Sequence, residues 1–165
     1  MNRDIHDETH KLVELIGRRL AQQKKTIAVA ESCTGGLLAE LLTDVPGASA
    51  YFTHGWVAYS NLAKINELGV PADLIEKYGA VSEQVAQAMA EGARKRARTD
   101  FAIAVTGIAG PAGGSEQKPV GLVYIAVQSD NCCETKRFII PGDRNSIRLG
   151  AANTALNMLR LKLRV

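Results

Sequence analysis

The sequence predicts a layered α/β domain with a mixed sheet. Thr26–Ala30 and Phe101–Val105 are short apolar runs of the kind found in strands that are buried on both faces. Segments with the apolar spacing of helices lie before, between and after these runs. Because buried strands alternate with helices, we expect a sheet that is covered by helices.

The first part of the chain predicts a helix, a buried strand and a second helix in succession. Apolar residues recur every three or four positions over Asp4–Lys24, which predicts a helix. The strand Thr26–Ala30 follows, and after a turn of small residues a helix is expected over Leu37–Leu42. Tyr51–Ser60 is expected to form a strand, followed by a short helix around Leu62–Leu68.

The middle of the chain predicts two further helices before the second buried strand. Pro71 with Ala72 opens a short helix, because proline is well tolerated at a helix start. Ser82 with Glu83 begins a longer one, with serine in the capping position. The apolar strand Phe101–Val105 then leads into a loop rich in glycine.

The last part of the chain predicts a strand pair and a final helix. Val120–Gln128 and Glu134–Ile140 are expected to form an antiparallel pair joined by a short polar turn. The final helix is expected from Asp143 to about Leu163, and it carries two apolar stripes. So wide an apolar surface predicts burial on two sides, one of them a candidate subunit interface.

Composition places the chain among ordinary globular proteins. Its 165 residues are enough for one domain, and we expect a single domain over residues 1–165. A net charge of +3 is too slight to suggest a nucleic-acid partner. No apolar run is long enough to cross a membrane, and no signal peptide is evident. Three cysteines, two of them adjacent, do not form a disulfide framework, so we expect a cytoplasmic protein.

Loops of small residues follow both buried strands. Ligands of open α/β sheets bind beyond the carboxyl ends of strands, so parallel neighbours would bring these two loops to one site. The turn Glu31–Gly36 presents the hydroxyl of Ser32, and the amides of Thr34, Gly35 and Gly36 are expected to be free to bind an anion. An equally weighted alternative is that Ser32 or Thr34 only caps a helix.

A serine nucleophile needs a base, and this chain is poorly supplied with histidine. His6, His10 and His54 are its three histidines, and two of them lie near the N-terminus. A buried lysine with a lowered pKa is the known substitute. Lys64 is the best candidate, because hydroxyl and amide side chains cluster immediately before it.

Three other arrangements compete with this pair. Cys33 is a rival nucleophile because a helix start favours a thiolate, but its side chain is expected to point away from that of Ser32 and toward packing, so it ranks second. Ser115 and Lys118 have the Ser-x-x-Lys spacing of β-lactamases, but neighbouring glycines and a proline disfavour the helix that the motif requires, so we interpret this segment as a loop and a candidate lid. His6 and His10 are spaced as in a zinc-binding helix, but no third ligand is evident and we expect no metal.

Arginines gather in two places. Arg144 and Arg148, at the start of the final helix, are candidates for holding a phosphate through their planar guanidinium groups, with a surface salt bridge as an equally weighted alternative. The cluster Arg94–Arg98 is expected to complement the carboxyl end of its helix rather than to bind nucleic acid.

Several blocks of residues together resemble the CinA C-terminal family, which includes nicotinamide-nucleotide amidohydrolases. The blocks are Ala30–Gly36, Tyr59-Ser60-Asn61 with Lys64, Gly79–Ser82, Gly107–Pro111, Gly114-Ser115-Glu116 with Lys118–Gly121, and Gly142-Asp143-Arg144. The resemblance runs from about Ile27 to Leu159. It implies a three-layer α/β/α sandwich with a mixed, mostly parallel sheet, and assembly into a homodimer.

The resemblance also implies a reaction, the hydrolysis of nicotinamide mononucleotide to nicotinate mononucleotide and ammonia, with no cofactor. The nucleophile of the family matches Ser32, its lysine base matches Lys64, and an assisting tyrosine matches Tyr59. With Arg148 added, the residues expected around the substrate are Thr34, Gly35, Gly36, Asn61, Thr106, Gly107, Gly110, Arg144 and Arg148.

Two other functions stay open at this point. The chain could be a catalytically inactive relative that keeps the pocket and only binds a nucleotide. A phosphotransferase is a weaker alternative, because the glycine loop allows it but a phosphate-loop lysine and metal-binding carboxylates are missing. In each case the expected partner is a small nucleotide, without nucleic acid or a membrane.

Overall fold

The computed structural model describes residues 2–165, and it describes side chains from Glu8 onward. Its sheet has five strands in the order β2-β1-β3-β4-β5. The strands are β1 (Ile27–Glu31), β2 (Phe52–Val57), β3 (Phe101–Gly107), β4 (Leu122–Gln128) and β5 (Cys133–Ile139). Strand β1 is parallel to β2 and to β3, whereas β4 is antiparallel to β3 and to β5. Four strands therefore run one way and β4 runs the other, which confirms the mixed, mostly parallel sheet.

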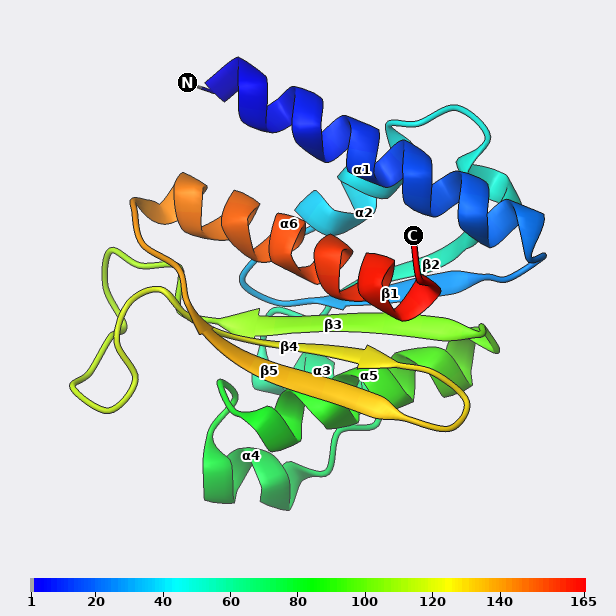
Figure 1. The fold of residues 1–165 in the computed structure, drawn as a ribbon. Coiled ribbons are helices and arrows are strands. Elements are labelled where there is room, and N and C mark those ends of the chain that lie inside the picture. The colour runs from blue at the N-terminus through cyan, green and yellow to red at the C-terminus, as the bar shows by residue number, and fades with distance from the viewer. Residues whose placement is uncertain (1) are drawn as a thin grey trace.

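Helices cover both faces of this sheet, as Figure 1 shows. Helices α1 (Asn2–Gln22), α2 (Leu37–Thr43) and α6 (Arg144–Leu163) lie on one face. Helices α3 (Asn61–Leu68), α4 (Ala72–Tyr78) and α5 (Glu83–Ala97) lie on the other, and a 3-10 turn, η1 (Ala48–Ala50), precedes β2. The expected three-layer α/β/α arrangement is confirmed.

Side-chain caps fix the starts of the longer helices. The hydroxyl of Ser82 accepts a hydrogen bond from the amide of Val85 at the start of α5. The carboxylate of Asp143 accepts one from the amide of Ser146 at the start of α6. Each cap satisfies an amide that the helix itself leaves unpaired, so both predicted helix starts are confirmed.

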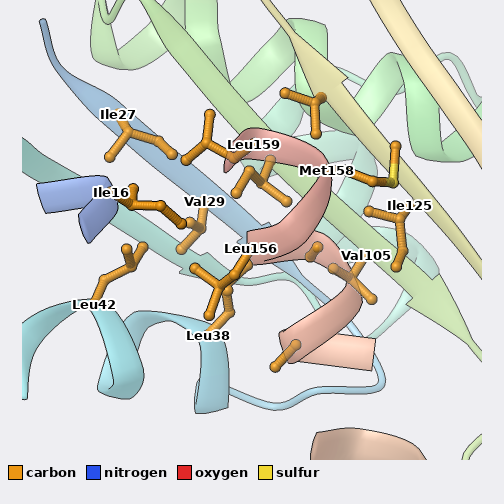
Figure 2. Packing of buried hydrophobic residues seen from close by; sticks show 14 of the residues in the cluster. Ile16, Ile27, Val29, Leu38, Leu42, Val105, Ile125, Leu156, Met158 and Leu159 are labelled. Atoms are coloured by element: carbon orange, nitrogen blue, oxygen red, sulfur yellow. The ribbon is translucent and has the colours of Figure 1, made fainter. Parts of the chain in front are cut away.

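The larger hydrophobic core lies between the sheet and the helices α1, α2 and α6. Figure 2 shows side chains from all four elements pointing into this space, among them Ile16, Ile27, Val29, Leu38, Leu42, Leu156 and Leu159. A second buried cluster, which includes Met89 of α5, covers the opposite face. Both faces of β1 and β3 are buried in consequence, which explains their uninterrupted apolar sequences.

Helix α6 is covered on two sides, as its two apolar stripes predict. One side packs against β3 and β4, and α1 lies across another side. The expected burial on two sides is therefore confirmed, and α1 provides one of the two covers from within this chain. Within α6, Leu161 is the exposed large apolar residue.

None of the helices in the described part of the chain combines the length and the apolar character that a membrane crossing requires.

Candidate active site

The carboxyl ends of β1 and β3 meet at one edge of the sheet. These strands are parallel neighbours, and the pairing continues one residue further, where the amide of Ser32 donates to the carbonyl of Val105 over 3.0 Å. On the other side, the amide of Ala58 donates to the carbonyl of Glu31 over 2.9 Å. Ser32 is thus held between the extensions of β2 and β3, and both small-residue loops begin at the same edge, as expected.

Lys64 lies beside Ser32 in the interior of the protein. Its Nζ is 3.0 Å from Oγ of Ser32, and it donates to the carbonyl oxygens of Ala58 at 2.9 Å and of Tyr59 at 3.1 Å. The side chains are closed off from solvent, with Lys64 1% exposed and Ser32 8% exposed. A neutral amine in this place gives its two N–H groups to the carbonyls and turns its lone pair toward the serine hydroxyl.

Burial also changes the acid–base behaviour of this lysine. Removal from water lowers the pKa of Lys64 below its ordinary value of 10.5, and this effect outweighs the opposing influence of the nearby Cys33. Among the described residues, no carboxylate forms an ion pair with Lys64 that would hold it in the charged form. The site therefore favours a neutral amine more than the surface of the protein does.

The carboxylate of Glu31 shapes the turn from inside. It is fully buried, and it accepts hydrogen bonds from the amides of Gly36 at 3.1 Å, Leu38 at 3.0 Å and Ala39 at 2.8 Å. These are amides that the start of α2 leaves unpaired, so an internal carboxylate occupies the place where a bound anion is usually found. No feature of the sequence pattern singled out Glu31, because its reach depends on how the turn folds back.

Two of the three amides expected to be free are therefore in use. The amide of Gly36 is bound by Glu31, and that of Gly35 donates to the carbonyl of Ser32 over 3.0 Å. The expectation that Gly35 and Gly36 offer amides to a ligand is wrong. The amides of Cys33 and Thr34 bond to no other residue in the described part of the chain, so the available donors lie closer to Ser32. Gly35 and Gly36 instead supply positive φ angles of 62° and 99°.

Cys33 is not the reactive thiol that its position at a turn suggested. Its side chain is buried, and a Cβ at Gly107 would lie 3.1 Å from its sulfur. Burial raises the pKa of Cys33 to about 11, and the nearby negative charge of Glu31 adds to the effect. A thiol with this pKa stays protonated near neutral pH, so a thiolate is not favoured here, and the expectation that the side chain of Cys33 packs in the interior is confirmed.

Arg144 and Arg148 both reach the site from the first two turns of α6. Arg148 donates through Nε at 3.2 Å and Nη2 at 2.8 Å to one acceptor, the carbonyl of Thr34. Arg144 is exposed, and it donates to the carbonyl of Gly110 at 2.7 Å and to the hydroxyl of Tyr59 at 3.0 Å. Neither arginine pairs with a carboxylate of the described residues, so the surface salt-bridge alternative is wrong.

Two further residues that were predicted to contact the substrate, Thr106 and Asn61, differ in their exposure to solvent. The buried hydroxyl of Thr106 donates to the carbonyl of Ala80 over 2.9 Å, which ties the end of β3 to the α4–α5 connection. Asn61 is exposed as the first residue of α3, which is capped by Ser60.

The competing Ser–Lys pair does not form. Nζ of Lys118 donates to the carbonyls of Tyr78 at 2.7 Å and Val81 at 2.8 Å, while Oγ of Ser115 accepts from the backbone amide of Lys118. The segment is a loop, as expected, and Lys118 anchors it to the α4–α5 connection.

The zinc-helix alternative finds no support in the described residues. The side chain of His6 lies outside them, and the ring of His10 lies between Glu14 at 3.5 Å and Asp44 at 3.4 Å. Across the described part of the chain, no group of three or more potential metal-ligating residues is close enough to hold an ion.

A serine paired with a buried lysine at the carboxyl edge of parallel strands defines this chain as an α/β protein with a Ser–Lys site. The chain belongs to the CinA C-terminal domain family, whose model matches residues 9–163. Among solved structures, the competence/damage inducible protein CihA from Agrobacterium tumefaciens is 43% identical, with a TM-score of 0.92 over 95% of this chain and 96% of that one. The competence damage-inducible protein A from Klebsiella pneumoniae is 38% identical, with a TM-score of 0.92 over 94% and 97%.

Longer relatives contain this domain as one part. A CinA-like protein from Geotalea daltonii is 55% identical over 138 residues, which are 84% of this chain and 33% of that protein. A putative competence-damage inducible protein from Desulforudis audaxviator is 49% identical over 156 residues, 94% of this chain and 37% of that protein. The chain thus spans about a third of the length of these curated relatives.

Proposed function

We propose that this chain is an amidohydrolase that converts nicotinamide mononucleotide to nicotinate mononucleotide and ammonia. The observation that carries the proposal is the 3.0 Å contact between Nζ of Lys64 and Oγ of Ser32, made in a buried site without a carboxylate partner among the described residues. This arrangement provides a nucleophile and a base of lowered pKa in hydrogen-bond contact, which is what amide attack requires.

In the first half of the reaction, Ser32 attacks the carboxamide carbon. Lys64 takes the hydroxyl proton of Ser32 as the new C–O bond forms, and the carbonyl oxygen becomes an oxyanion. The amides of Cys33 and Thr34 lie on the turn that follows the nucleophile and bond to no other residue in the described part of the chain, and we assign the oxyanion to them. A donor of this kind contributes about 3 kcal/mol to stabilising the transition state.

In the second half, the tetrahedral intermediate collapses and water completes the reaction. Lys64 returns its proton to the amide nitrogen, the C–N bond breaks, and ammonia departs. The acyl group stays on Ser32 as an ester. Water then gives a proton to Lys64 and attacks the ester, which releases the nicotinate product and restores the hydroxyl of Ser32. The two carbonyls that hold Lys64 keep its nitrogen directed at the serine in both steps.

We assign the phosphate of the substrate to Arg144. Its guanidinium is exposed, and two of its N–H groups hold the Gly110 carbonyl and the Tyr59 hydroxyl at the edge of the site. Its other N–H groups have no partner among the described residues, and a planar guanidinium suits a phosphate. Binding energy from this remote group would align the amide with Ser32.

Ammonia release measured with purified protein and nicotinamide mononucleotide tests the proposal. We expect ammonia and nicotinate mononucleotide in equal amounts, and we expect Ser32→Ala to bind the nucleotide without releasing either. Wild-type protein that binds the nucleotide and releases no ammonia would establish the alternative, an inactive nucleotide-binding relative. Activity that survives in Ser32→Ala would remove the proposed nucleophile.

We also propose that the chain works as a cytoplasmic homodimer. The support for a dimer is an exposed apolar surface beside the site, formed by Val57, Tyr59 and Leu62, which are 54%, 57% and 65% exposed. Sedimentation equilibrium tests the dimer, and replacement of Leu62 by a charged residue is expected to shift the protein toward the monomer.

A further inference from the structure

We propose that Arg148 is a positioning residue, which holds the nucleophile turn in its reactive shape and does not bind the substrate. The inference rests on the proposed function, and it divides the work of the two arginines of α6. Arg144 meets the anionic group of the ligand, and Arg148 acts through the backbone of Thr34, two residues after the nucleophile.

The contacts of Arg148 carry this assignment. Its Nε and Nη2 converge on the single carbonyl oxygen of Thr34, at 3.2 Å and 2.8 Å, and the side chain is half-buried. A Cβ built on Gly35 would lie 3.5 Å from Nη2, so the guanidinium also packs against the next residue of the turn. Two bonds to one acceptor and this packing leave the group little freedom to turn toward a ligand.

The turn is thereby held from two sides. Glu31 fixes the amides of Gly36, Leu38 and Ala39 from the interior, and Arg148 fixes the carbonyl of Thr34 from α6. Between these attachments lie the amides of Cys33 and Thr34, which bond to no other residue in the described part of the chain. Without Arg148, the Thr34 carbonyl would accept one hydrogen bond, from the amide of Leu37 at 3.3 Å. The turn would then be free to rotate away from the geometry that attack requires.

Arg144 differs from Arg148 in each of these respects. It lies one helical turn earlier on the same helix, it is exposed, and its partners belong to two loops on either side of the site. One of these partners is the hydroxyl of Tyr59, which can rotate when a ligand arrives.

A comparison of variants on substrates with and without phosphate tests the division. For Arg148→Met we expect kcat to fall about 10- to 100-fold with little change in KM, on nicotinamide mononucleotide and on nicotinamide riboside alike. For Arg144→Met we expect KM to rise on the nucleotide, and the rise to shrink on the riboside. Arg160→Met is the matched control, because Arg160 is an arginine of the same helix that also donates to a backbone carbonyl, that of Val165 at 2.8 Å.

Two results would overturn the assignment of Arg148. One is a loss in Arg148→Met that appears as a rise in KM and disappears on the riboside, which would make Arg148 a phosphate ligand. The other is a kcat equal to that of the control variant. Arg148→Lys, which keeps one donor near Thr34, should recover part of kcat, and unfolding midpoints of all variants identify any that fails to fold.

A second readout does not depend on amide hydrolysis. A fluorophosphonate reacts with an activated serine, since the serine oxygen bonds to phosphorus, fluoride leaves and the base takes the proton. We expect labelling of Ser32 to slow about tenfold or more in Arg148→Met and to stay at the wild-type rate in Arg160→Met. If no ammonia is released but this pattern holds, the proposed function fails and the positioning role stands; equal labelling of both variants overturns the positioning role.

Discussion

Replacing Lys64 with methionine keeps a long unbranched side chain and removes the amine. The change deletes three contacts of Nζ, to Ser32 at 3.0 Å, to Ala58 at 2.9 Å and to Tyr59 at 3.1 Å. Because the amine is the proposed base, we expect kcat for ammonia release to fall about 10²- to 10⁴-fold, the range that a general base contributes. The binding of nicotinamide mononucleotide should change little, since Lys64 makes no proposed contact with its phosphate.

The same change should leave the fold largely intact. Two backbone carbonyls lose a donor, at a cost of about 1 kcal/mol or more each. The buried amine no longer has to be taken from water, which offsets that loss. We therefore expect the unfolding free energy of Lys64→Met to stay within about 2 kcal/mol of the wild type, so the loss of rate will not reflect unfolding.

The dependence on pH separates a base from a structural lysine. Burial places the pKa of Lys64 below 10.5 in the folded protein, so kcat should fall as pH decreases through that pKa and the amine becomes charged. Between the folded pKa and 10.5 the unfolded chain binds more protons than the folded one, so the unfolding free energy of the wild type should rise with pH across that window. Lys64→Met should lack this contribution.

Lys118 provides a matched control for this experiment. Its Nζ also donates to two backbone carbonyls, those of Tyr78 and Val81, but it does not contact Ser32. We expect Lys118→Met to keep kcat within about threefold of the wild type. A kcat in Lys64→Met above a tenth of the wild-type value, or an equal loss in both variants, would refute the assignment of Lys64 as the base.

Three further substitutions test other parts of the site and its support. Cys33→Ala should keep kcat within about threefold, because a thiol with a pKa of about 11 is protonated at neutral pH; a loss as large as that of Ser32→Ala would contradict this. Glu31→Gln replaces one accepting oxygen with a donor, so we expect urea unfolding to show a loss of about 2 kcal/mol in the unfolding free energy and ammonia assays to show a lower kcat. A variant with unchanged stability and kcat would refute the proposal that Glu31 holds the turn in shape. Gly92→Ala should destabilise the protein by about 3 kcal/mol, because its Cβ would overlap the carbonyl oxygen of Leu68; an unchanged unfolding midpoint would show that α3 and α5 can separate at little cost.

Local patterns predicted the fold well because they act over a few residues. The apolar runs of β1 and β3, the caps at Ser82 and Asp143, and the turn between β4 and β5 each depend on neighbouring side chains. The packing of α1 on α6 could not be predicted in this way, because a second apolar stripe shows that a helix surface is buried but does not identify the element that covers it.

The site was predictable where its geometry follows from strand order. Parallel neighbours bring the loops after β1 and β3 together, whereas sequence spacing alone could not settle the choice of Lys64, which the family resemblance supported. The partners of the polar groups were not predictable in the same way. Arg148 and Thr34 are 114 positions apart, and the capture of three amides by Glu31 depends on the three-dimensional path of the turn.

The buried carboxylate of Glu31 has a consequence for the design of inhibitors. A helix start usually attracts phosphonates and other anionic warheads, but here the first amides of α2 already surround a negative charge. An anion placed there would meet Glu31 instead of free donors. A neutral electrophile, such as an aldehyde or a boronic acid, becomes charged only after Ser32 adds to it. An oxygen of the tetrahedral adduct can then accept hydrogen bonds from the amides of Cys33 and Thr34.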